Sequence, residues 1–300
     1  MVDLLDNDGF VDGLLSSAAI VVPLVVALLV LRRWRAGPLP IGGVAATGVS
    51  LLALARIDAL PGALALGVVL AGIGGLLGAA ASLPLVGRWV LVAPGVVLAV
   101  GSVDGRPGWM TAAAIAAGVT MGPAADSVDH WFRTTGLGVA MLCVTVAGVF
   151  VTIPETGTIA PVLGAMVPVG LLAVPWPVAW LGPGGASAML ALLATLTLDG
   201  GWVRPGAIVG GLLAPGLLVL LAWLPWPPSA AVDRPWPPLA MQLAALQILV
   251  ALGVTRVAGL RESAWGALTI AAVVLAGGAL AARWAIVRSG RADRARSGSS

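Results

Sequence analysis

Runs of apolar residues follow one another along the whole chain and are separated by short polar breaks. Most of these runs approach the length of about 20 residues that a helix needs to cross a hydrocarbon core of about 30 Å. Helices suit this environment because their backbone N–H and C=O groups are satisfied within the segment. The pattern therefore predicts an all-α integral membrane protein, a polytopic bundle of transmembrane helices with short loops.

The pattern predicts about eleven spans, within a range of about nine to twelve. They are residues 14–31, 41–57, 61–82, 88–102, 109–125, 135–153, 158–180, 185–198, 206–224, 239–255 and 264–287. The fourth and eighth spans are short for a full crossing, so they are either tilted pieces, re-entrant segments or buried half-helices. The expected organisation is an acidic extracytoplasmic N-terminus (1–13), a single transmembrane domain (14–287) and a disordered arginine-rich cytoplasmic tail (288–300).

Charged residues at the two ends of the chain predict its orientation. The N-terminal segment is acidic, whereas arginines follow the first span and fill the tail. The positive-inside rule then places the N-terminus outside and the C-terminus in the cytoplasm, which requires an odd number of crossings. Beyond the bilayer itself, the expected partners are anionic lipids bound by the arginines of the tail.

The composition agrees with a membrane protein and excludes several other classes. Hydrophobic residues make up 59% of the chain and charged residues 10%, with a mean hydropathy of +1.05, whereas soluble domains carry about 25% charged residues. The 16 basic residues are all arginine, and tyrosine is absent, which indicates a GC-rich genome. The expected location is the inner membrane of a bacterium. No nucleic-acid partner is expected, because the arginines are scattered or lie at membrane edges.

Small residues recur in the third span, at Gly67, Ala71, Gly74, Gly75 and Gly78. Small residues let helix backbones approach closely where the hydrophobic effect does not drive association. This pattern predicts that the third helix lies at the centre of the bundle.

The densest polar cluster is the segment 126–133, which the predicted topology puts on the cytoplasmic side. On a helix, Asp126, Asp129 and Arg133 share one face. Either the two carboxylates hold Mg²⁺ against a diphosphate, or Asp129 pairs with Arg133 on a short interfacial helix. We favour the structural interpretation. His130, the single histidine, cannot form a metal site without ligands from elsewhere. Asp126, Asp129, His130 and Arg133 are therefore weak candidates for catalytic residues. No metal site is expected.

Two other positions bear on function. Glu155 lies in a turn between two long apolar runs; it is either an interfacial turn residue or, if the turn folds back into the bundle, a proton or cation binding site. Arg88 begins the fourth span and Asp104 ends it, so these two cannot pair with each other.

No motif identifies a reaction: a P-loop, a zinc-protease motif and the paired aspartate-rich motifs of UbiA-type prenyltransferases are all missing from the sequence. The favoured hypothesis is a permease-like carrier or a non-enzymatic accessory subunit. As a carrier it would have a cavity near the bilayer midplane, reached by helices broken at places such as Pro94-Gly95. The alternative is a membrane enzyme acting on a lipid-linked phosphate through Asp126 and Asp129, with Mg²⁺ as cofactor.

Overall fold

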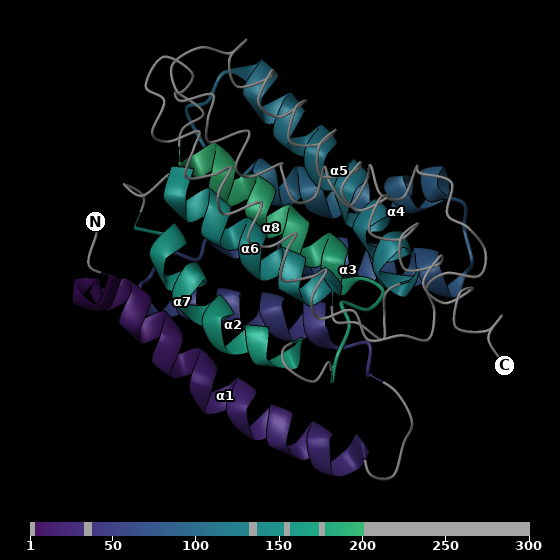
Figure 1. The fold of residues 1–300 in the computed structure, drawn as a ribbon. Helices are drawn as coiled ribbons and strands as arrows, with labels where there is room; N and C mark the ends of the chain where they lie inside the picture. The colour runs from purple at the N-terminus through teal and green to yellow at the C-terminus, as the bar shows by residue number, and fades with distance from the viewer. Residues whose placement is uncertain (1–3, 33–37, 132–136, 153–156, 174–177, 201–300) are drawn as a thin grey trace, which may run out of the picture.

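A computed structural model describes residues 4–32, 38–131, 137–152, 157–173 and 178–200. All regular elements in these ranges are helices (Figure 1). They are the 3₁₀ helix η1 (Leu4–Asp6), α1 (Asp8–Arg32), α2 (Gly42–Arg56), α3 (Gly62–Ala80), α4 (Leu85–Val100), α5 (Gly108–Trp131), α6 (Leu137–Thr152), α7 (Ile159–Val169), the 3₁₀ helix η2 (Gly170–Leu172) and α8 (Gly185–Asp199). The predicted all-α class is confirmed for this part of the chain.

Eight of the predicted spans coincide with helices, with the largest differences at three ends. One is the end of α5, which continues to Trp131 rather than residue 125. Helix α1 begins at Asp8, within the segment expected to precede it, because the Asn7 side chain accepts a hydrogen bond from the Phe10 N–H (3.0 Å) and so caps the helix. The seventh helix ends earlier than residue 180, with α7 at Val169 and η2 at Leu172. Pro175 and Pro177 follow directly, and proline disfavours a continuing helix. The last three spans and the tail lie outside the described residues.

Two of the described helices, Asp8–Leu31 and Gly62–Ala80, are long and apolar enough to cross a membrane, by length and composition only. The helices α2, α4, α7 with η2, and α8 are apolar but shorter. The eleven-helix membrane bundle therefore stays a prediction.

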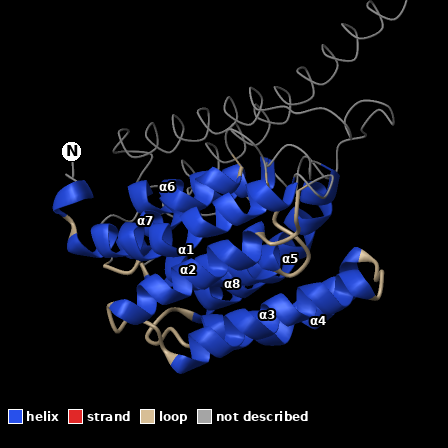
Figure 2. Cartoon of the chain, turned by 90° about the horizontal axis from the view of Figure 1, so that it is seen from below, coloured by secondary structure: helices blue, strands red, loops and turns tan. Residues whose placement is uncertain are grey.

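The most extensive helix contacts are α3 with α4, α1 with α7, and α5 with α8 (Figures 1 and 2). Glycines set the closest approaches. A Cβ added at Gly74 would collide with the Leu91 carbonyl of α4, and one at Gly164 would collide with the Phe10 carbonyl of α1. Backbone packs directly on backbone at both crossings, as expected for helices that associate without a hydrophobic driving force.

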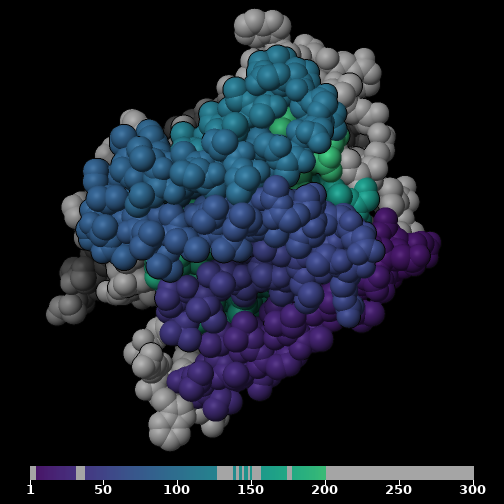
Figure 3. All heavy atoms as spheres, turned by 180° about the vertical axis from the view of Figure 1, so that it is seen from behind, coloured from purple at the N-terminus to yellow at the C-terminus, as the bar shows by residue number. Residues whose placement is uncertain are grey.

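Among the described helices the central one is α8 rather than α3. The place of the third helix in the complete bundle stays a prediction, because the last three predicted spans lie outside the described residues. Thirteen of the fifteen residues of α8 are buried, and it contacts α2, α3, α4 and α5. Helix α3 instead uses its glycines on one side and leaves Leu66, Ile73 and Leu77 exposed on the other. Figure 3 shows α3, α4 and α5 along one face of the molecule, with only small green patches of α8 visible between them.

Helix α4 is not broken at Pro94-Gly95, contrary to the expectation for a carrier. It continues to Val100, and a Cβ at Gly95 would collide with the Ala71 N–H of α3, so this step is a helix crossing. Physically, a proline removes one hydrogen bond, and the small neighbour allows close packing that compensates for it.

Non-helical backbone lies instead between α7 and α8, where a buried extended segment pairs with the start of α2. The Leu39 N–H donates to the Val178 carbonyl (3.0 Å), and the Trp180 N–H donates back to the Leu39 carbonyl (2.9 Å). The first N–H groups of α2 then bind the carbonyls of Trp180 and Leu181 at 2.8 and 2.9 Å. This pairing satisfies the start of α2, which has no side-chain cap. It also positions the start of α8.

Candidate functional site

A partly buried ion pair joins α4 to α5. Arg88, in the first turn of α4, places its Nη1 3.4 Å from Oδ2 of Asp126, near the end of α5. The Arg88 Nε also donates to the Leu83 carbonyl at 3.1 Å, which fixes the guanidinium against the turn before α4. Asp126 is only 6% exposed. The pair forms because these helices follow each other in antiparallel order, so the start of one lies beside the end of the other.

Bare glycine backbone surrounds this pair and a third polar residue, Ser187, in the first turn of α8. A Cβ at Gly78 would lie 2.9 Å from the Arg88 Cγ. A Cβ at Gly75 or at Gly122 would lie 2.7 or 3.0 Å from the Ser187 Oγ. Ser187 thus lies where α8 packs against α3 and α5, and Arg88 and Asp126 lie at the neighbouring contacts of α4 with α3 and α5. We call Arg88, Asp126 and Ser187, with the glycines 75, 78 and 122, the junction cluster.

Two buried polar atoms of this cluster have no hydrogen-bond partner among the described residues: Oδ1 of Asp126 and Oγ of Ser187. Asp126 lies one helical turn beyond Gly122, on the face of α5 that also meets Ser187. A buried polar group without a partner costs about 1–3 kcal/mol. The cluster therefore holds unused hydrogen-bonding capacity.

Desolvation governs the charge of Asp126, which lies one residue beyond the predicted fifth span. Burial raises the pKa of Asp126 from 3.8 to about 6, and the positive charge of Arg88 lowers it by a smaller amount. The carboxylate is thus ionised at neutral pH but close to its titration range. It is a group whose charge can change under mild acidification.

Of the candidate residues predicted from the sequence, Asp126 is the one whose side chain the structure describes. Asp126 lies inside the fifth helix, which extends to Trp131, rather than in a separate segment after a span that ends at residue 125. Its partner is Arg88 on another helix. Asp129 and His130 lie in the last turns of α5, and their side chains are not described. Arg133 and Glu155 fall outside the described residues, so the Asp129–Arg133 pair and the Glu155 site are untested.

Sequence reasoning missed Arg88 and Ser187 as members of the site. A signal for Arg88 was present, since the predicted topology places the start of the fourth span and the end of the fifth on the same side of the membrane. Arg88 was compared only with Asp104, at the opposite end of its own helix. Ser187 had no such signal, because a serine in an apolar run is not distinctive.

The described residues contain no group of three or more His, Cys, Asp or Glu that could hold a metal ion. A Mg²⁺ site at Asp126 and Asp129 would need Asp126 to accept both the cation and Arg88. A carboxylate has the lone pairs for this, but the two positive charges would repel each other.

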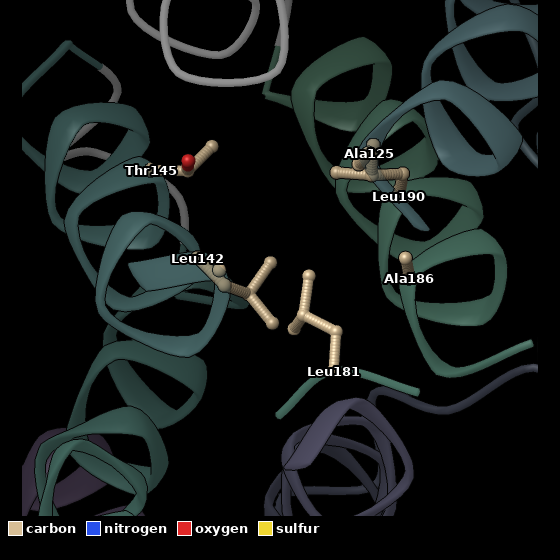
Figure 4. Close-up of a pocket in the computed structure, with 7 residues that line it drawn as sticks. Ala125, Leu142, Thr145, Leu181, Ala186 and Leu190 are labelled. Atoms are coloured by element: carbon tan, nitrogen blue, oxygen red, sulfur yellow. The ribbon is translucent and has the colours of Figure 1, made fainter. Parts of the chain in front are cut away.

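An apolar pocket lies beside the cluster, between α5, α6 and the start of α8 (Figure 4). It is small, with room for about one water molecule. Its lining residues are Ala125, Gly138, Leu142, Thr145, Leu181, Ala186 and Leu190. The Leu142 and Leu181 side chains point toward each other across it.

Comparison with known proteins adds no assignment to this geometry. No protein-family model, no curated protein and no solved structure matches the chain.

Proposed function

We propose that this protein is a permease-like membrane carrier whose solute path passes through the junction cluster. The observation that supports this most is the partly buried Arg88–Asp126 pair, at the predicted cytoplasmic edge of the helices, with unsatisfied polar atoms beside it. Ionisable residues within membrane bundles are costly and commonly line substrate or ion pathways.

Stability alone does not account for the ion pair. The cost of moving two charges out of water often exceeds their mutual attraction, and apolar side chains of similar volume serve equally well or better. The contact also has poor geometry, because good charge-assisted hydrogen bonds are about 2.7–2.9 Å long and this one is 3.4 Å. A role in binding explains why both charges occur at this position.

The start of α8 provides a second line of support. Carrier sites are commonly built where helices are interrupted and a half-helix begins inside the protein. Helix α8 begins after a buried extended segment, at two glycines with left-handed backbone, Gly182 (φ +76°) and Gly184 (φ +87°). Ser187 is in the first turn of that helix.

Water access to Ser187 tests the carrier without knowledge of its solute. The Ser187→Cys variant is made with Cys143→Ala, which removes the single native thiol, and membrane vesicles are treated with a charged methanethiosulfonate reagent. The matched control is Ala191→Cys, one turn further along α8 and also fully buried. A carrier exposes its site in part of its cycle, so position 187 should react and position 191 should not.

Two results of this experiment would overturn the proposal. No reaction at either position would mean a permanently closed bundle, which fits the accessory-subunit hypothesis. Equal reaction at both positions would mean that α8 as a whole is open to water and that the junction cluster is not a defined path. Melting temperatures measured beforehand show whether the cysteine variants keep their fold.

The second candidate function is an enzyme that acts on a lipid-linked phosphate. It is favoured by the two carboxylates Asp126 and Asp129, about one helical turn apart near the end of α5. Melting of the purified protein with Mg²⁺ or Mn²⁺ and prenyl diphosphates separates the two functions, since ligands of the folded state raise stability. A metal-dependent rise in melting temperature that is lost in Asp126→Asn/Asp129→Asn would support the enzyme and contradict the carrier.

A further inference from the structure

We infer that the junction cluster binds a small zwitterion, a solute with an ammonium group and a carboxylate of amino-acid size. This inference rests on the proposed carrier and specifies the class of its solute.

Charge balance is the first argument. Arg88 and Asp126 together are neutral, and they are the charged residues that the described structure places in the cluster. A solute with net charge would leave one buried charge uncompensated, which costs several kcal/mol. A zwitterion can separate the pair and still leave each charge facing its opposite: its carboxylate meets Arg88, and its ammonium meets Asp126.

Unused hydrogen-bonding capacity is the second argument. Asp126 binds Arg88 through Oδ2 alone, which leaves Oδ1 able to accept from an ammonium group. The Ser187 hydroxyl also has no partner among the described residues and can accept from the ammonium or donate to the carboxylate. The long single contact to Arg88 leaves the guanidinium able to form the forked pair that it prefers with a carboxylate.

Size and access are the third argument. On α3 and α5 the cluster is lined by glycine backbone, at 75, 78 and 122, so the helices approach closely and leave little room beside the polar side chains. Only a small solute can enter when Arg88 moves aside. The Arg88 side chain is 20% exposed and the Asp126 side chain is 9% exposed. A solute can therefore enter the cluster beside Arg88.

The test measures binding of radiolabelled alanine to the purified full chain in lipid nanodiscs by equilibrium dialysis. We expect saturable binding that unlabelled glycine displaces, whereas acetate and methylammonium at equal concentration do not, because each carries only one of the two charges. Arg88→Gln and Asp126→Asn should each weaken binding about tenfold or more, the loss expected for one charge-assisted hydrogen bond.

Further variants control for structural damage. Ser187→Ala should weaken binding by a smaller factor, about threefold to tenfold. Ser50→Ala removes another fully buried serine, one that binds the Ala46 carbonyl within α2, and should leave binding unchanged. Arg88→Lys keeps the positive charge but loses the two parallel N–H donors of the guanidinium. This variant should therefore bind alanine more tightly than Arg88→Gln does.

The inference is overturned if alanine shows no saturable binding, if acetate or methylammonium alone displaces it, or if Ser50→Ala weakens it as much as Ser187→Ala. If the Ser187→Cys variant is labelled but alanine does not bind to the native chain, the proposal of a carrier stands and only the proposed solute class is wrong. If the Ser187→Cys variant is not labelled, both proposals fail together.

Discussion

Asp126 shows how burial and charge act together on one side chain. Its local sequence marks it as polar, but its properties come from the helices packed around it and from Arg88. Because burial is the larger effect, the folded protein holds a proton on this carboxyl more readily than the unfolded chain does. Of the polar segment 126–133, the residue that the structure describes fully is thus a buried partner of another helix, rather than part of an exposed surface.

The stability of the protein should depend on pH through this residue. The folded-state pKa, about 6, lies above the ordinary value of 3.8. The folded protein therefore binds more protons between these values, and the Asp126 contribution to the free energy of unfolding falls as pH rises from about 4 to about 6. Asp126→Asn should remove this part of the pH dependence, which melting temperatures measured across that range would show.

Loss of Arg88 should be costly at pH 7.5 and less so at pH 5. At the higher pH, Arg88→Gln leaves a buried carboxylate without its counter-charge, at a cost of about 3 kcal/mol, or about 5–10 °C in melting temperature. At pH 5 the carboxyl is largely protonated, so the loss should shrink. Melting in detergent at both pH values measures this; an equal loss at the two pH values would contradict the electrostatic explanation.

At the scale of elements, the helices follow from local pattern and their ends from local chemistry. Asn7 caps α1, and the prolines after residue 172 stop the seventh helix. The extended pairing between residues 39–43 and 178–181 has no comparable local signal. It depends on two segments far apart in the chain, and the glycines that permit it, Gly182 and Gly184, resemble the many others in this sequence.

Gly182→Ala and Gly105→Ala form a matched pair that tests this extended pairing. Both glycines have left-handed backbone, at φ +76° and +73°. A Cβ at Gly182 would collide with the Pro40 carbonyl, whereas a Cβ at Gly105 would meet open space. Gly105→Ala should cost about 1 kcal/mol for backbone conformation alone, and Gly182→Ala about 3 kcal/mol or more.

Melting temperatures of the two glycine variants give the comparison directly. The smaller effect of Gly105→Ala serves as the control for backbone strain. Equal melting temperatures would mean that residues 178–182 do not pack against the start of α2 as described.

Across the part of the chain that the structure describes, α8 occupies the centre and α3 lies at one face, with exposed leucines on its outer side. Such an apolar outer surface suits a lipid environment. The predicted topology adds that the N-terminus is outside and the C-terminus is in the cytoplasm.

Reporter fusions test this topology. Alkaline phosphatase fused after Ser300 should be inactive, because eleven crossings place the C-terminus in the cytoplasm, where its disulfides do not form. The same enzyme fused after Gly200 should be active, since eight crossings return the chain to the outside. Activity or inactivity at both points would contradict the predicted three spans after residue 200.

The sequence by itself determined the helical class and the approximate position of every α-helix that the structure describes. This was possible because the length of an apolar run and the prolines, glycines and caps around it are local properties. Tertiary structure alone decided which of the described helices is central, which glycines form crossings, and that Asp126 pairs with Arg88. The physical reason is that these helices are apolar on nearly all sides, so no periodic polar face marks the side that is buried, and contacts between distant segments depend on shape.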